Sequence, residues 1–353
     1  SMLIISFGQV VMNKILVNIP SKENKLIDSF GRKIDYLRIS VTDRCNFRCT
    51  YCMPENMKFL PKKDLLTFDE MDYLCSLFIS RGITKIRLSG GEPLVRKGLI
   101  DFISNLSRFI SSGDLKEITL TTNGSLLNKM SKQLYDSGVR RINVSLDTLM
   151  KDKFYQITRR DDLENVIKGL MTAKDNGLKI KINTVMIKNK NFDEINNIIE
   201  WAHKNDFDIS LIETMPMGLT DQDRIDQYIS LVEVEKEIKK KYSLEETNYK
   251  TAGPSFYKKT DKTNNLIGFI TPLSNNFCAN CNRIRLTSTG KLFMCLGQND
   301  NIDFRSIIRT GNIMQLNSSI DKAMKIKPKA HDFNITKRNQ RPSVSRHMSV
   351  TGG

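Results

Sequence analysis

The chain has 353 residues, of which 39% are hydrophobic and 27% charged, and its formal net charge is +16. This composition is typical of a globular protein, and no apolar run is long enough for a transmembrane helix, so we expect no membrane segment. The length accommodates one large α/β domain and a smaller one. Six of the seven cysteines fall into two groups, which favours metal ligation in a reducing cytoplasm over a disulfide framework.

Segments typical of strands alternate with segments typical of helices along the first two thirds of the chain. The expected strands are 36–41, 85–88, 117–121, 141–146, 179–187 and 208–212. The expected helices are 67–81, 99–111, 126–137, 163–176 and 193–205. Thr67 and Glu70 form a capping box at the start of the first helix. Six such units predict a parallel sheet with helices outside it, and they are too few for a closed eight-unit barrel.

We therefore expect an α/β fold, with an open, partial six-unit parallel β/α barrel over residues 26–245. Residues 1–25 form an N-terminal extension in this division, and residues 246–353 form a C-terminal domain. Ligands of parallel sheets gather at the carboxyl ends of the strands. The segments that follow each strand are therefore candidates for a functional site.

Three cysteines follow the first expected strand in a C-x3-C-x2-C run: Cys45, Cys49 and Cys52. An iron–sulfur cube is normally held by four thiolates, so three leave one iron with an open coordination position. The alternative is a structural zinc site. Zinc in such a site takes four protein ligands, and no further Cys or His lies within twenty residues on either side.

The stretch from Arg38 to Pro54, with Tyr51 between its last two cysteines, resembles the cluster loop of radical S-adenosylmethionine enzymes. The resemblance implies that family's partial barrel and a [4Fe–4S] cluster whose unligated iron binds S-adenosylmethionine. One-electron cleavage of this cofactor then gives a 5′-deoxyadenosyl radical. The resemblance also makes the three cysteines catalytic as well as metal-binding, and it places Tyr51 at the cofactor.

Further candidate residues follow the second, fourth and sixth strands. Gly90-Gly91 alone is usually a turn, but a glycine pair also lets a ligand approach the backbone closely. Together with Glu92-Pro93 it resembles the family segment that binds the amino group of S-adenosylmethionine, which implies contacts by Gly91 and Glu92. The resemblance adds Ser145 and Met215 as cofactor contacts, although core packing is the ordinary interpretation of Met215.

A second group of three cysteines lies in the C-terminal region: Cys278, Cys281 and Cys295. This spacing also fits a zinc ribbon that lacks one ligand. The adjacent Arg283-Ile284-Arg285 places two arginines on one face of an extended segment. Because guanidinium groups match phosphate oxygens, a metal site beside them indicates an anionic nucleotide as substrate. The region from Lys250 onward is basic, with 17 Lys/Arg against 5 Asp/Glu.

The run from Phe277 to Leu286 and the final Thr351-Gly352-Gly353 resemble the GTP 3′,8-cyclase family, also called molybdenum cofactor biosynthesis protein A. The resemblance implies a second [4Fe–4S] cluster, on the C-terminal cysteines, whose open iron holds the guanine base. It implies the following substrate contacts, with Arg285 also catalytic: Arg38, Lys85, Arg87, Thr121, Lys181, Arg283, Ile284, Arg285, Gly352 and Gly353. Because Lys85, Arg87 and Lys181 alternate with apolar residues, we expect them to face the barrel interior.

The activity implied by this family is conversion of GTP to 3′,8-cyclo-7,8-dihydro-GTP, the first step of molybdenum cofactor biosynthesis, through removal of the ribose 3′ hydrogen. Implied partners are GTP, an external one-electron reductant, a downstream cyclic pyranopterin monophosphate synthase and, by analogy, a second copy in a homodimer. We expect neither nucleic acid nor membrane as a partner. Ser210 departs from the family pattern, which often has arginine there. Two alternatives are a peptide-modifying radical enzyme with an auxiliary cluster and a basic zinc protein that binds nucleic acid.

Overall fold

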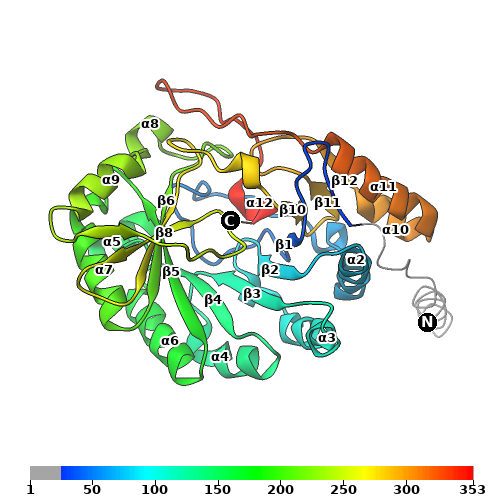
Figure 1. Cartoon of the computed structure of the whole chain (residues 1–353), viewed down its shortest axis with the longest axis horizontal. Helices are drawn as coiled ribbons and strands as arrows, with labels where there is room; N and C mark the ends of the chain where they lie inside the picture. The colour runs from blue at the N-terminus through cyan, green and yellow to red at the C-terminus, as the bar shows by residue number, and fades with distance from the viewer. Residues whose placement is uncertain (1–24, 353) are drawn as a thin grey trace.

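Six parallel strands form the centre of the sheet in the computed structural model, which describes residues 25–352 (Figure 1). In chain order they are β1 (Tyr36–Ser40), β2 (Lys85–Ser89), β3 (Glu117–Thr122), β4 (Arg141–Ser145), β5 (Lys179–Met186) and β6 (Asp208–Glu213). Each pairs in parallel with the next. The predicted six-unit parallel architecture is confirmed, because every expected strand lies within one residue of its expected bounds.

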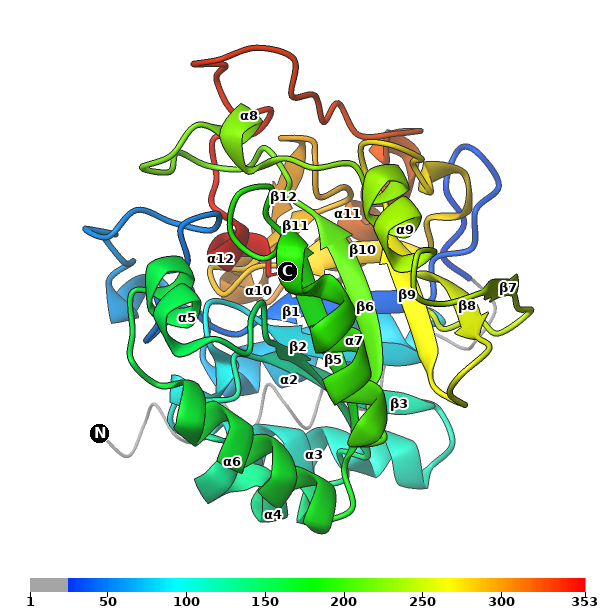
Figure 2. The same ribbon diagram turned by 90° about the vertical axis from the view of Figure 1, so that its left-hand side faces the viewer.

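Five helices connect these strands and cover the outer side of the sheet, as Figure 2 shows. They are α2 (Phe68–Ser80), α3 (Leu99–Ser111), α4 (Leu127–Asp136), α6 (Leu163–Asp175) and α7 (Ile195–Lys204). All five were expected from apolar periodicity. Three other helices before the C-terminal region were not predicted: α5 (Lys151–Thr158), α8 (Arg224–Gln227) and α9 (Leu231–Ile238).

Side chains alternate between the two faces of each central strand, as the pleat requires. On β1, Leu37 and Ile39 belong to the hydrophobic core beneath the helices, whereas Arg38 points into the barrel. On β2, Ile86 is in the core and Arg87 faces the interior. The apolar core therefore lies between sheet and helices, and the barrel interior is lined by polar and charged side chains.

Strands from the C-terminal region extend the same sheet at both edges. At one edge β9 (Leu266–Ile270) pairs in parallel with β6 and is followed by antiparallel β8 (Phe256–Thr260) and β7 (Leu244–Glu246). At the other edge β10 (Arg283–Leu286) pairs in parallel with β1 and is followed by antiparallel β11 (Lys291–Phe293) and β12 (Asn301–Asp303). The division of the chain at residue 246 stays a prediction, but the strands after it belong to the sheet of the barrel.

Three helices complete the C-terminal region: α10 (Phe304–Thr310), α11 (Ile313–Ile326) and α12 (Met348–Thr351). The first two lie beside α2, where the rings of Phe78 and Phe304 are 5.9 Å apart (Figure 1). The predicted N-terminal extension, residues 1–25, lies outside the described residues except for Lys25. In residues 25–352, the helices are all too short or too polar to cross a membrane.

Thr67→Ala should lower the free energy of unfolding by about 1 kcal/mol, because the capping box is present as predicted. The Thr67 hydroxyl accepts a hydrogen bond from the Glu70 N–H at 3.1 Å, and the Glu70 carboxylate accepts one from the Thr67 N–H at 2.8 Å. Urea unfolding followed by circular dichroism measures the change. Thr67→Ser keeps the hydroxyl and should retain most of the stability; equal losses in both variants would contradict the capping role.

Candidate active site

The first cysteine loop, residues 41–54, follows the carboxyl end of β1 and is held by the end of α5. The Arg48 N–H donates to the Thr158 carbonyl at 2.9 Å, and the Thr50 N–H donates to the Ile157 carbonyl at 2.9 Å. The three cysteines of the loop are partly buried and form no disulfide. A helix that was not predicted therefore fixes the backbone on both sides of Cys49, the middle one of the three predicted cluster ligands.

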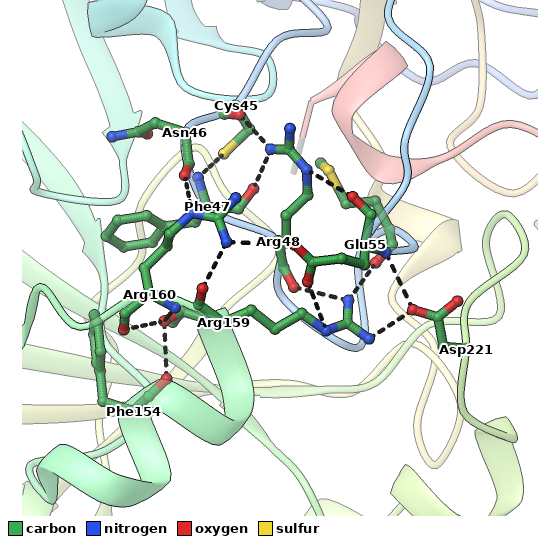
Figure 3. A network of polar contacts seen from close by, with 11 residues as sticks. Cys45, Asn46, Phe47, Arg48, Glu55, Phe154, Arg159, Arg160 and Asp221 are labelled. Carbon is green, nitrogen blue, oxygen red and sulfur yellow. Dashed lines mark hydrogen bonds and ion pairs between the residues drawn. The ribbon is translucent and has the colours of Figure 1, made fainter.

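A network of ion pairs ties this loop to the segment after β6 (Figure 3). Arg159 ends α5 in the left-handed conformation, with φ 57°, and its guanidinium lies 2.6 Å from Asp221 and 3.2 Å from Glu55. Arg48 donates to the carbonyl of Cys45 at 2.6 Å. Apart from Cys45, none of these residues was a predicted site residue, and no local motif marks them.

Gly90-Gly91, after β2, lies directly against the cysteine loop. The Gly91 N–H donates to the Thr42 carbonyl at 2.8 Å. A Cβ atom on Gly90 would lie 2.2 Å from the Thr42 carbonyl oxygen, and one on Gly91 would lie 2.3 Å from that of Arg44. The glycines are thus required for contact between two protein loops, a reason that the sequence analysis does not give. Contact of Gly91 with S-adenosylmethionine stays a prediction.

The carboxylate of Glu92 is fully buried and organises the turn after β3. It accepts hydrogen bonds from the Leu94 N–H at 3.1 Å, the Thr122 hydroxyl at 2.7 Å and the Asn123 N–H at 2.6 Å. Burial raises the pKa of this carboxyl to about 7. The side-chain amide of Asn123 lies 3.9 Å from the Cys45 Sγ. Glu92 therefore positions a second loop beside the first cysteine, and its cofactor contact stays a prediction.

Tyr51 anchors the cysteine loop to the end of β4. Its hydroxyl donates to Asp147 Oδ2 at 2.8 Å, and the other carboxylate oxygen accepts from the Val185 N–H at 2.8 Å. Burial raises the pKa of Asp147 to about 6, and burial next to Asp147 raises the pKa of Tyr51 well above its usual value. Ser145, a predicted cofactor contact, is half-buried at the end of the same strand.

Inside the barrel lies a cavity that contains about 1020 Å³ of space outside protein atoms, including open solvent. Five cationic side chains line it, each 6% to 9% exposed: Arg38, Arg87, Lys181, Arg283 and Arg285. All five were predicted substrate contacts, and Met215, a predicted cofactor contact, also lines the cavity. Burying a charged side chain has a high desolvation free energy unless an opposite charge lies close by.

Two of these cations, Lys181 and Arg285, have no acidic partner among the described residues. Burial lowers the pKa of both. Burial also lowers the pKa of Arg38 to about 10, and the charges of Arg87 and Arg283 act in the same direction. A polyanionic ligand would supply the missing negative charge.

Other predicted substrate contacts are placed differently. Lys85 is half-buried at the start of β2, and Thr121 accepts a hydrogen bond from Arg87 at 3.3 Å; neither lines the cavity. The side chain of Ile284 is in the hydrophobic core, on the opposite face of β10 from its neighbouring arginines. Contacts of these three residues with substrate stay predictions, and Gly353 lies outside the described residues.

The end of the described chain is buried between the two cysteine regions. Arg285 donates to the carbonyl of Gly352 at 2.5 Å, and the Ser349 N–H donates to the thiol of Cys52. Gly352 has φ 74°, and a Cβ there would lie 1.9 Å from the Ser89 hydroxyl oxygen. Only glycine fits this position. Gly352 is not among the residues that line the cavity, so its contact with substrate stays a prediction.

The second cysteine set lines the cavity: Cys278, Cys281 and Cys295. Two cations reach one of these thiols, because Arg283 Nη2 and Lys327 Nζ each lie 3.7 Å from the Cys281 Sγ. Burial alone would raise the pKa of Cys281, but the charges of Arg283 and Lys327 lower it to about 7. Burial raises the pKa of Cys295.

Both cysteine sets fit iron–sulfur clusters. In the part of the chain that the structure describes, no three His, Cys, Asp or Glu side chains surround a single metal ion. Each thiolate of a [4Fe–4S] cluster binds its own iron, so its ligands need not converge on one point. Within each set the thiols are close enough for their charges to interact.

Several cavity residues escaped the sequence analysis. Asn143 and Asn183 line the cavity, and the buried side-chain oxygens of both lack a hydrogen-bond partner. Strand alternation would have found them, because they share a face with Ser145 and Lys181. His331 lines the cavity from an irregular C-terminal segment for which the sequence gives no periodic signal.

The chain matches two protein-family models and resembles solved structures. A model of the Radical SAM superfamily matches residues 39–202, and one described as Molybdenum Cofactor Synthesis C matches residues 207–333. The solved structure of Streptococcus suis SuiB bound to S-adenosylmethionine has a TM-score of 0.58 and 15% identity, covering 76% of this chain and 63% of that chain. That similarity shows a shared fold.

The curated relatives include proteins named GTP 3′,8-cyclase. The one from Brucella ovis is 53% identical over 334 residues, which is 94% of this chain and 97% of the relative. The one from Rhizobium etli is 54% identical over 329 residues, which is 93% of this chain and 94% of the relative. The fold and the superfamily match define a radical S-adenosylmethionine enzyme with iron–sulfur and S-adenosylmethionine cofactors. The chain belongs to the GTP 3′,8-cyclase family.

Gly91→Ala should remove the first cluster, because the added Cβ would collide with the Arg44 carbonyl and displace the cysteine loop. Iron and sulfide of anaerobically purified protein should each fall from about eight to about four per chain. Gly113→Ala is the control: with φ 81° it carries backbone strain, but no atom lies within 4 Å of its added Cβ, so it should lose some stability and keep its iron. A full complement of iron in Gly91→Ala would contradict this account of the glycine pair.

Proposed function

We propose that this chain converts GTP to 3′,8-cyclo-7,8-dihydro-GTP with S-adenosylmethionine as cosubstrate, the first step of molybdenum cofactor biosynthesis. The observation that carries the proposal is the cavity with five buried cations, lined by one set of three thiols and joined to the other through α12. A triphosphate carries several negative charges, which offset the cost of burying these cations. Its oxygens also match the planar donors of four arginines.

The two cysteine sets have separate tasks in this proposal. Cys45, Cys49 and Cys52 would hold the first [4Fe–4S] cluster, which when bound supplies the electron that cleaves S-adenosylmethionine to a 5′-deoxyadenosyl radical. The other set would hold the second cluster, at the guanine base: Cys278, Cys281 and Cys295. The ribose 3′ hydrogen is the atom removed.

The other residues bind, orient and exclude water. Arg285, Arg38 and Arg87 lie in register on the neighbouring strands β10, β1 and β2, and they bind the triphosphate together with Arg283 and Lys181. Asn143 and Asn183 accept hydrogen bonds from hydroxyl or amino groups of the bound molecules, since their buried oxygens have no protein partner. The buried tail at Gly352 separates the radical from solvent, which protects a reactive intermediate.

The proposed partners follow from the chemistry. Cluster reduction requires an external one-electron donor, and the cyclised nucleotide is the substrate of a downstream cyclic pyranopterin monophosphate synthase. Cysteine-ligated clusters favour a reducing compartment, so we place the enzyme in the cytoplasm. A homodimer is proposed by analogy with the family.

Metal analysis separates this function from the basic zinc protein. Anaerobically purified protein should contain about eight iron and eight sulfide per chain from two [4Fe–4S] clusters. Incubation with GTP, S-adenosylmethionine and a reductant should then give the cyclised nucleotide, identified by mass. Zinc in place of iron would leave both thiol sets structural, and cluster-loaded protein without a nucleotide product would favour the peptide-modifying alternative.

Cys45→Ala should abolish formation of 5′-deoxyadenosine, because the first cluster loses one of three protein ligands. Chromatography of the reaction mixture measures this product. Cys75→Ala is the matched control, since Cys75 is fully buried in the core and belongs to neither set. Retained 5′-deoxyadenosine in Cys45→Ala would show that these thiols do not carry the cleavage.

Arg285→Ala should weaken GTP binding by roughly 10- to 100-fold, the size expected for loss of hydrogen bonds to a charged group. Cleavage of S-adenosylmethionine should continue without cyclisation. Equilibrium dialysis with GTP and quantification of 5′-deoxyadenosine measure the two effects. Arg338→Ala removes an exposed arginine and should change neither; unchanged GTP affinity in Arg285→Ala would contradict the assigned role.

A further inference from the structure

Lys327 is a buried lysine to which the proposed reaction gives no task. It follows α11, is 2% exposed and is not among the residues that line the cavity. An ammonium group removed from water is costly without compensating contacts or opposite charge. The neighbouring Lys325 and Lys329 are exposed, as most lysines are.

The contacts of Lys327 place its charge at the second cysteine set. Its Nζ donates to the Met294 carbonyl at 2.6 Å and to the Arg283 carbonyl at 3.0 Å, and it lies 3.7 Å from the Cys281 Sγ. Met294 directly precedes Cys295. The ammonium group has three N–H donors, and it connects the start of β10, next to Cys281, with the end of β11, next to Cys295.

The group of opposite polarity near Lys327 is a thiol. In residues 25–352, no carboxylate forms an ion pair with Lys327, and the Cys281 Sγ lies 3.7 Å from its Nζ. Arg283 also contacts the Cys281 thiol, but its guanidinium lines the cavity and is committed to the substrate. Lys327 thus places an ammonium group at the thiol of Cys281, a predicted cluster ligand, whether or not GTP is bound.

We propose that Lys327 is a positioning residue that raises the reduction potential of the C-terminal cluster by donating a hydrogen bond to the thiolate of Cys281. The inference rests on the proposed function, which puts a [4Fe–4S] cluster on that cysteine set. A reduced cluster carries one more negative charge than an oxidised one, so a cation at a ligand sulfur stabilises the reduced form.

The test is a redox titration of the anaerobic holoenzyme followed by electron paramagnetic resonance. The signal that S-adenosylmethionine alters belongs to the first cluster, and the unaltered signal belongs to the second. In Lys327→Met the ratio of reduced to oxidised second cluster at a given potential should fall at least tenfold, a shift of about 59 mV for one electron. The first cluster should not shift. Lys329→Met removes an exposed lysine and should behave as wild type.

Lys327→Gln covers the case in which Lys327→Met fails to assemble the cluster. It keeps a hydrogen-bond donor for the two carbonyls but removes the charge, so a lower potential supports the proposal and an unchanged potential overturns it. An intact second cluster with unchanged potential in Lys327→Met also overturns it. Wild-type protein with only about four iron per chain would instead show that the proposed second cluster is absent, a failure of the proposed function.

Discussion

The burial of five cations inside the barrel is the constraint on which the rest of this structure depends. The interior of a parallel β/α barrel is usually filled by layers of branched apolar side chains. Here Arg38, Arg87 and Lys181 occupy such positions, so hydrophobic packing cannot close the interior. The apolar core is confined to the space between sheet and helices. What remains is an open chamber whose positive charge requires a polyanion.

The added edge strands strengthen this constraint. β10 sets Arg285 opposite Arg38 and Arg283 opposite Tyr36 in the parallel register with β1. Like charges on neighbouring strands destabilise the pairing, and nearly complete burial increases the cost. Sequences tend to break such rules at functional sites. The pairing is therefore best understood as a binding surface made from two distant parts of the chain, with the second cysteine set brought to the chamber by the same strand.

The features that could be predicted from the sequence are those that depend on a local residue pattern, such as strand orientation and loop position. Alternation of Ile86 with Arg87 was enough to orient β2, and the glycine pair was enough to mark a loop of the site. The reason for the glycines could not be predicted, since it lies in the carbonyl oxygens of Thr42 and Arg44, which come close only in the folded chain. Helix α5 was missed because it has few apolar residues, although it holds the cysteine loop. The pairing of β1 with β10 joins residues far apart in sequence, which no local periodicity encodes.

Two buried lysines show how the positive charge is divided between substrate and cofactor. Lys181 lines the cavity, and its Nζ contacts the Tyr257 hydroxyl at 2.9 Å, a neutral partner that an incoming phosphate can replace. Lys327 contacts two carbonyls and a thiol, and it is not among the residues that line the cavity. Lys181 can thus exchange its protein partner for a phosphate, whereas Lys327 keeps its protein partners. Because its contacts are all with the protein, Lys327 sets a constant electrostatic background for the second cysteine set in this proposal, and changes on ligand binding must come from the cavity cations, Lys181 included.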